Sequence, residues 1–354
     1  MNSAPITVFI DSFGGSPYLA EALRGVLSSP DQSSFTPCRI ITVATIHAAS
    51  AAADLLSSGD YAIAYRDCII HFHGTRKSTA DPLTVQSASS LIESLKGSND
   101  RYAMELARRS TSRLMLRYAW MRSDFEKHRE IHGEAKDDLD CFTELLHARL
   151  SPRAAFLVNE AKVKYLRYRT LHSHMLSKQE FQTELDSSTT IVEYEALLLK
   201  AVIDYRLQFN EDSSWTIREG LHQLNDDFLL LRDSIMRHAD PQLEALCNSW
   251  GAFVLTAEQT NEIDLLPEPA KREKRLSLLR PIFQPLWFYF VALCQTLQDG
   301  EFGLTATDAY WLGLIDEVAG ADLPTLRLAF EHRPDSPRGA NPVSPKKKRT
   351  KPKP

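Results

Sequence analysis

The sequence has few cysteines, and they are not arranged in pairs. Five are scattered along the 354 residues: Cys38, Cys68, Cys141, Cys247 and Cys294. An odd number without the short spacing of a zinc site or redox motif argues against both a disulfide framework and a zinc ligand set. We therefore expect reduced thiols, which favours the cytoplasm as the compartment.

We expect no N-terminal signal peptide, and the sequence has no long apolar run. Met1 is followed by polar residues and then by a strand-like segment, without the small-residue cleavage site of a signal peptide. The most apolar segment, residues 285–293, is short for a membrane span, so we expect it to be a buried helix. We expect no membrane contact, and the length suffices for one large or two ordinary domains.

Charge is distributed unevenly along the chain. Residues 331–354 hold eight Lys or Arg and two acidic residues, a charge of +6, whereas residues 1–330 hold 33 basic and 44 acidic residues, a charge of −11. The last ten residues, 345–354, are Pro-rich and lack apolar side chains, and the tail is expected to be disordered. We expect it to be a solvated end. The alternative is that this tail, and no other part of the chain, contacts nucleic acid.

Near the N-terminus, three segments carry chemistry in a suggestive order. Residues 6–10 form a β-branched and aromatic run, typical of a strand, that leads into Gly14 and Gly15. Two glycines allow a sharp turn with backbone N–H groups directed at one point, as an oxyanion hole requires.

A serine and a histidine follow this glycine pair. Residues 40–46 predict a second buried strand and residues 48–58 a helix of small side chains, so Ser50 falls at their junction. Residues 67–72 predict a third strand that ends near His71. A histidine there is a candidate base for the Ser50 hydroxyl, which is a weak nucleophile unaided.

These segments resemble the proteolytic subunit of the Clp protease and the wider crotonase-like superfamily. The matching residues are Asp11-Ser-Phe-Gly14-Gly15, His47-Ala-Ala-Ser50 and Ile69-Ile70-His71. Residues 83–109 take the place of the family's handle helix, and Leu304-Thr-Ala-Thr-Asp-Ala-Tyr-Trp-Leu-Gly-Leu-Ile-Asp316 is similar to its closing motif. The resemblance implies an α/β fold with a ββα spiral core.

Between the two matching ends lies a segment that the family lacks. Residues 154–176, 190–208, 216–237 and 277–297 show apolar residues at helical intervals. We predict a Clp-like core with its handle helix over residues 1–111, a helical insertion domain over 112–298, the end of the core over 299–330 and a disordered tail over 331–354. Within the closing motif, Thr305 and Asp308 predict a capped helix start, and Gly313 predicts its end.

The acid of a catalytic triad has three candidates. Asp299 lies in a predicted turn just ahead of Leu304 and is our first choice. Glu301 fits the family spacing better, and Asp124 has the spacing from the handle helix, although residues 113–128 contain no helix breaker. Such an acid would hold the His71 tautomer and stabilise the imidazolium.

The resemblance implies a serine peptidase that needs no metal or cofactor. Ser50 would attack a peptide carbonyl, His71 would move the proton, and N–H groups at Gly14 or Gly15 and at Ala51 would hold the oxyanion. It also implies peptide or unfolded-protein substrates and a ring-like homo-oligomer. A regulatory partner could bind the helical insertion.

Two other classes remain open. A catalytically inactive Clp-like scaffold, binding through the insertion, is favoured by the short stretch before the first strand and by the undecided acid. An acyl-CoA enzyme of the same superfamily is the third hypothesis.

Two weaker patterns lie in the predicted insertion. His128 and His132 share a helix face, as metal ligands do, but lack a third ligand at a telling distance. Arg232 and His238 have the loose spacing of a helical ribonuclease motif. We expect both patterns to be ordinary helix surface.

Overall fold

The sheet is built around one long strand, β2. The computed structural model describes residues 5–29, 38–77, 82, 84–132, 137–177 and 255–325. In this part of the chain six strands form one sheet: β1 (Ile6–Ser12), β2 (Ile40–Ala49), β3 (Tyr61–Tyr65), β4 (Ile69–His73), β5 (Glu301–Thr305) and β6 (Glu317–Ala319). The fold is therefore mixed α/β, with a curled sheet.

The curl follows from how β2 shares its neighbours. Residues 40–44 of β2 pair with β1 and, from residue 41 onward, with β3, whereas His47–Ala49 pair with β4; after a register shift, Ser12 of β1 also pairs with Ala48. These pairings are parallel, as is β3 with β6, and β5 closes the edge antiparallel to β4. The end of β2, where Ser50 follows, therefore lies beside β4, which carries His71.

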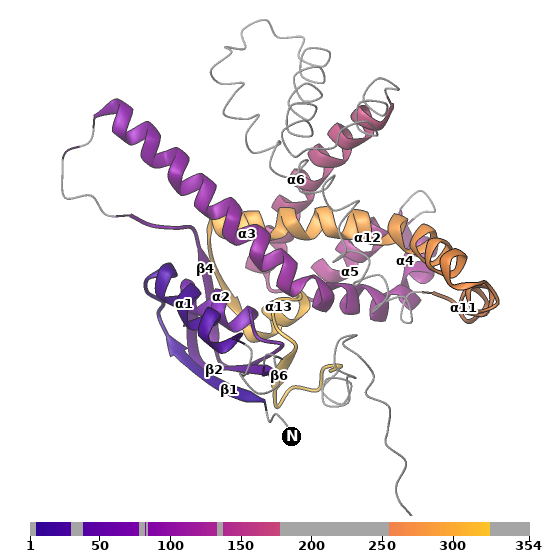
Figure 1. Cartoon of the computed structure of the whole chain (residues 1–354), viewed down its shortest axis with the longest axis horizontal. Coiled ribbons are helices and arrows are strands. Elements are labelled where there is room, and N and C mark those ends of the chain that lie inside the picture. The colour runs from indigo at the N-terminus through magenta and orange to yellow at the C-terminus, as the bar shows by residue number, and fades with distance from the viewer. Residues whose placement is uncertain are drawn as a thin grey trace, which may run out of the picture. The chain divides into compact units, whose positions relative to one another are not determined.

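Helices follow the strands and then dominate the middle of the described chain. They are α1 (Pro17–Leu27), α2 (Ala51–Ser57), α3 (Val85–Met121), the 3₁₀ turn η1 (Arg122–Asp124), α4 (Phe125–His132), α5 (Asp138–His147), α6 (Pro152–Ser177), α11 (Ala257–Asp264), α12 (Glu268–Asp299) and α13 (Ala306–Trp311). In Figure 1, α12 crosses α3, and it also packs against α6. Residues 286–294 of α12 are buried on every side, as expected of a core helix.

The helical region agrees with several sequence expectations and departs from others. The expected helices at 154–176 and 277–297 are present within α6 and α12. The helix expected at 83–109 continues to Met121, across the expected domain boundary at residue 111. The 3₁₀ turn η1, which includes Asp124, then interrupts the helical course, where no break was predicted. Residues 1–321 cluster as one compact unit and 322–354 as another.

Some expectations fall outside the described residues. These are the helices at 190–208 and 216–237, the pair Arg232 and His238, Cys247 and the tail at 331–354. Within the described chain, no helix combines the length and apolar character needed to span a bilayer.

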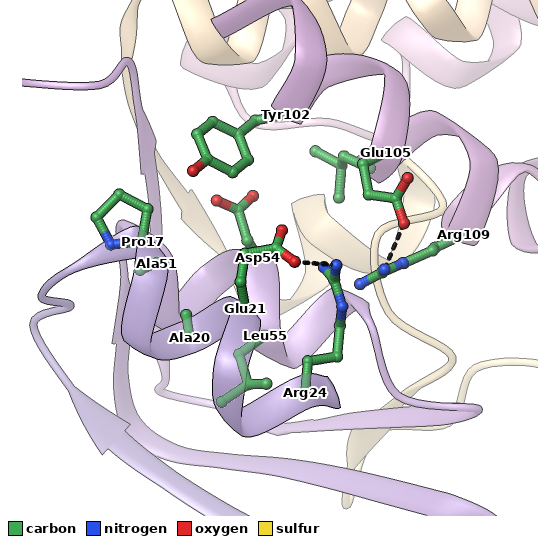
Figure 2. Close-up of a pocket in the computed structure, with 11 residues that line it drawn as sticks. Pro17, Ala20, Glu21, Arg24, Ala51, Asp54, Leu55, Tyr102, Glu105 and Arg109 are labelled. Atoms are coloured by element: carbon green, nitrogen blue, oxygen red, sulfur yellow. Dashed lines mark hydrogen bonds and ion pairs between the residues drawn. The ribbon is translucent and has the colours of Figure 1, made fainter. Parts of the chain in front are cut away.

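A pocket lies where α1, α2 and α3 approach one another (Figure 2). Ala51 and Asp54 of α2 line it, together with Glu21 and Arg24 of α1 and side chains from the middle of α3. Because Ala51 directly follows Ser50, this pocket adjoins the candidate nucleophile.

A capping box lies at the start of α13, as predicted from Thr305 and Asp308. Thr305 accepts a hydrogen bond from the Asp308 N–H, and the Asp308 carboxylate accepts one in return. Asp308 also accepts bonds of 2.8 Å from the N–H and the hydroxyl of Ser151, so the start of α6 is tied to the same cap. Gly313 has φ +76° directly after the helix, a conformation that glycine adopts at low cost.

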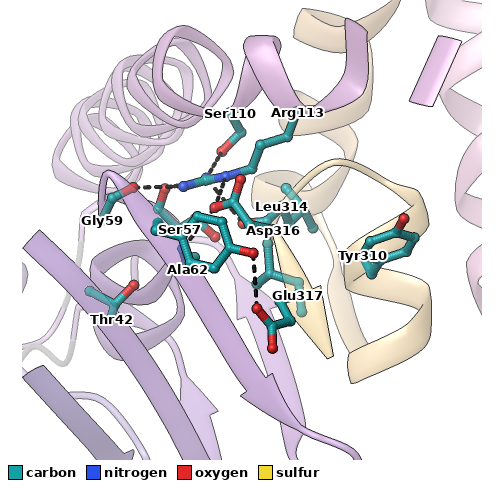
Figure 3. A network of polar contacts seen from close by, with 12 residues as sticks. Thr42, Ser57, Gly59, Ala62, Ser110, Arg113, Tyr310, Leu314, Asp316 and Glu317 are labelled. Carbon is teal, nitrogen blue, oxygen red and sulfur yellow. Dashed lines mark hydrogen bonds and ion pairs between the residues drawn. The ribbon is translucent and has the colours of Figure 1, made fainter. Parts of the chain in front are cut away.

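A buried network joins α3 to the end of the closing motif (Figure 3). The Arg113 guanidinium donates to Asp316 Oδ2 at 2.7 Å and to the carbonyls of Ser57 and Gly59 at 2.7 and 2.6 Å. Asp316 also accepts the Ala62 N–H at 2.7 Å. One ion pair thus links α3, the end of α2, β3 and β6.

A second arginine lies one turn further along α3. Arg117 is fully buried and donates to the carbonyls of Tyr310 and Ile315, both at 3.1 Å. Its guanidinium also lies 3.7 Å from the centre of the Tyr310 ring, a cation–π contact. Burial lowers the pKa of Arg117 to about 10, so it stays protonated at neutral pH.

Candidate functional site

Ser50 occupies a strained turn between β2 and α2. It caps α2 with φ +58° and ψ −132°, and it is the one non-glycine residue with positive φ in the described chain. A serine in this conformation costs about 1–3 kcal/mol, which the surrounding structure must offset. A sharp strand-to-helix turn of this kind presents a serine hydroxyl at the end of a sheet.

Gly14 supports this turn from the neighbouring loop. Its φ is +99°, and a β-carbon added to it would lie 2.5 Å from Ser50 Cβ and 2.6 Å from the Ala49 carbonyl oxygen. The backbone after β1 therefore contacts Ser50 so closely that a side chain is excluded. By contrast, a β-carbon on Gly15 would meet no atom within 4 Å.

The expected oxyanion donors differ in their availability. The Gly14 N–H donates to the Ser12 hydroxyl at 3.1 Å. Ala51 is the first residue of α2, where the N–H has no partner within the helix. The Gly14 N–H belongs to the loop that contacts Ser50, and the Ala51 N–H belongs to the helix that Ser50 precedes.

His71 lies beside Ser50 through the backbone of β4. The Ser50 N–H donates to the His71 carbonyl at 2.7 Å, and His71 pairs with Ala49 on one side and Gly303 on the other. A β-carbon on Gly303 would lie 3.8 Å from His71 Cδ2, so a larger residue there would contact the ring. The structure thus brings the two predicted residues onto adjacent strand ends.

The carboxylate beside His71 is that of Glu301. Its Oε2 lies 3.8 Å from His71 Nε2, within ion-pair range but longer than a hydrogen bond. In the described chain no other acid is this close to the ring. Glu301 also forms an exposed ion pair with Arg76.

The other two candidate acids have different partners. Asp299, our first choice from the sequence, is the last residue of α12 and accepts a 2.7 Å hydrogen bond from Lys164. Asp124 lies in η1 and pairs with Arg149 at 3.7 Å. The geometry therefore supports Glu301 as the partner of His71.

The electrostatic environment keeps His71 neutral near pH 7. Its pKa is lowered, first by partial desolvation and then by His73, whose ring centre lies 5.6 Å away; Glu301 opposes this effect. The pKa of Glu301 is lowered chiefly by the hydrogen bond from Arg76. A neutral imidazole can accept a proton, as a general base must.

Three of the residues around the site were not predicted from the sequence. His73 and Arg76 follow His71 closely, but nothing in their spacing distinguishes them from surface residues. Asp54 lies four residues after Ser50, within a helix whose other members are mostly small and apolar. The sequence signal that could have identified Asp54 was its position as the one acid in a helix of small apolar residues.

The histidine pair of α4 contacts an acid of α5. His128 Nε2 lies 2.7 Å from Glu144 Oε2, and its ring centre lies 4.4 Å from that of His132. Among the described residues, no three His, Cys, Asp or Glu side chains are placed to hold a metal ion together.

No family model matches the chain, and no curated protein matches it significantly.

Proposed function

We propose that the protein is a serine peptidase of the Clp-like type, with the ββα spiral core of that superfamily. The observation that carries the proposal is the Ser50 turn. A serine held at positive φ, with Gly14 packed against its β-carbon and a direct backbone hydrogen bond to His71, is expensive to keep unless the hydroxyl is used.

The residues suit acyl transfer. Ser50 Oγ attacks the carbonyl carbon of a peptide bond while His71 takes its proton, and the N–H groups of Ala51 and the Gly14–Gly15 loop stabilise the oxyanion. His71 then returns the proton to the departing amine as the C–N bond breaks. Water hydrolyses the acyl-enzyme by the same route, and Glu301 stabilises the imidazolium in both steps.

The exposed apolar face of α1 supports the further proposal of a homo-oligomer. None of the residues of α1 is buried, and Tyr18, Leu19 and Val26 are between 71 and 79% exposed. Apolar patches of this kind commonly mark interfaces. Mass measurement of the native protein in solution tests the assembly.

Four described cysteines are free thiols, which supports a cytoplasmic location.

A catalytically inactive scaffold is the second candidate. Two observations favour it: the Gly14 N–H is already bonded to Ser12, and Glu301 is shared with Arg76. In a scaffold, Ser50 would be unreactive.

Labelling with a fluorophosphonate probe, read by intact mass, separates the two. We expect a single adduct on the wild-type protein that is lost in Ser50→Ala. Ser58→Ala is the matched control, because Ser58 lies at the other end of α2 and its hydroxyl bonds only to the helix, at Leu55 O. An adduct that survives in Ser50→Ala, or no adduct at all, would overturn the peptidase proposal.

A further inference from the structure

The pocket beside Ser50 contains a carboxyl group that the proposed mechanism does not use. Asp54 lies on α2, one helical turn after Ser50, and faces the pocket between α1 and α3 (Figure 2). Desolvation raises its pKa to about 7, and the hydrogen bond that Gln298 donates to it at 3.1 Å opposes this only partly. Among the described residues, the hydrogen bond to Asp54 comes from a neutral amide, and Arg24 and Arg109 act on its carboxylate only at longer range.

The two cations that line the pocket are engaged by other acids. Arg24 forms an ion pair with Glu21 on α1, and Arg109 forms one with Glu105 on α3. Both arginines lower the pKa of Asp54 at longer range, but burial outweighs them. With each arginine matched by a glutamate, an ionised Asp54 gives the pocket a net negative charge.

The spacing from Ser50 sets the length of a ligand group. Four helical residues correspond to a rise of about 6 Å. A substrate residue whose carbonyl lies at Ser50 would need a long side chain to reach the Asp54 carboxyl. Lysine and arginine have this length, and their apolar stems would pass Ala51 and Leu55, which also line the pocket.

We infer that this pocket binds a cationic side chain, lysine or arginine, of the residue whose carbonyl Ser50 attacks, and that Asp54 is the residue that determines this specificity. The inference rests on the proposed function and deepens it. A bound lysine or arginine side chain would form an ion pair with the Asp54 carboxylate. A basic substrate therefore gains an interaction that a leucine substrate cannot make.

The test uses diphenyl aminophosphonate probes with arginine-like, lysine-like and leucine-like side chains on the full-length protein. Each probe forms a Ser50 Oγ–phosphorus bond and releases phenol, so the labelling rate is read by intact mass. We expect both basic probes to react faster than the leucine probe. In Asp54→Asn, which keeps the shape and the Gln298 contact, we expect the ratio of basic to leucine rates to fall by about 30-fold or more.

The pH dependence provides a second measurement. The ratio should rise as pH increases through about 7, because Asp54 ionises there, and it should be flat in Asp54→Asn. Glu21 and Arg24 from α1, Tyr102, Glu105 and Arg109 from α3, and Cys294 and Gln298 from α12 surround Asp54. Of these, Cys294 has a pKa well above its usual value, so it does not titrate in this range.

The outcomes separate the two proposals. If the fluorophosphonate labels Ser50 but the leucine probe is fastest, or if Asp54→Asn leaves the ratio unchanged, the pocket assignment is wrong and the peptidase stands. If the fluorophosphonate does not label the wild-type protein, the proposed function fails and the pocket assignment fails with it.

Discussion

Two polar clusters in this protein are constructed in opposite ways. Around Arg113, the guanidinium is buried and the Asp316 side chain is only 15% exposed, and both make bonds of 2.6–2.7 Å (Figure 3). Around Ser50, the His71 ring is 31% exposed, Glu301 is 61% exposed, and their nitrogen and oxygen atoms lie 3.8 Å apart. Each guanidinium nitrogen of Arg113 has a partner, whereas the groups of the second cluster have bonding capacity to spare.

The contrast separates residues that hold the fold from residues that we propose take part in a reaction. A buried charge with every donor satisfied resists change, because any loss leaves an unpaired group in a low-dielectric interior. A histidine near the surface with a loosely held acid can change its protonation state at small cost. Both clusters use segments from the two ends of the chain, so the fold that the first secures also aligns the second.

The largest expected effect is on stability, from removal of Arg113. In Arg113→Ala we expect the free energy of unfolding to fall by about 3–5 kcal/mol, because Asp316 and the two carbonyls lose their buried donor. Urea denaturation measures it. The control is Arg76→Ala, which breaks the exposed ion pair with Glu301 and should change the free energy of unfolding far less, because solvent screens that pair. Equal losses in the two variants would contradict the contrast between the clusters.

The next effect concerns the two glycines before α1. Gly14→Ala should destabilise the protein by about 1–3 kcal/mol and abolish fluorophosphonate labelling, because φ is +99° and the new methyl group would displace Ser50. Gly15→Ala is the matched control, since its β-carbon enters open space. We expect it to change stability by under about 0.5 kcal/mol. If Gly14→Ala were as stable and as reactive as Gly15→Ala, the backbone of Gly14 would not lie in close contact with Ser50.

Local signals in the sequence predicted much of this site. The strand runs before Gly14 and Ser50, the placement of Ser50 at a strand-to-helix junction, and the Thr305–Asp308 cap all depend on residues near one another in the chain. The structure reproduces each of them, although β2 extends to Ala49 and α2 begins at Ala51 rather than at 48. The short strands β3, β5 and β6 were not predicted, because three to five residues carry little periodicity.

The choice of acid depended on long-range register, which the sequence does not contain. β5 pairs with β4 so that Gly303 lies opposite His71 and Glu301 opposite His73. Side chains two residues apart in a strand share a face, so this register brings Glu301 to the His71 ring. Asp299 lies two residues earlier, still within α12. Where α12 ends and β5 begins therefore decides which of the two acids reaches His71.

A smaller effect distinguishes stability from function at Ser50. Ser50→Gly should be more stable than Ser50→Ala by about 1 kcal/mol, because glycine adopts φ +58° without steric cost and alanine does not. Both variants should fail to react with the fluorophosphonate. Thermal unfolding of the pair measures the difference. If alanine were the more stable of the two, the turn would not be strained in the way that its backbone angles indicate.

The smallest expected effect is on the titration of His71. Glu301 raises the pKa of His71, against the stronger lowering by desolvation, so Glu301→Gln should lower that pKa further. The imidazolium would then be less stable, and the acidic limb of the pH–rate profile for labelling should move to lower pH while the maximum rate falls. Asp299→Asn is the control, because Asp299 pairs with Lys164 and should leave both unchanged. NMR titration of His71 in the two variants reports the shift directly. A shift in Asp299→Asn but not in Glu301→Gln would restore Asp299 as the acid and would mean that Glu301 serves Arg76 alone.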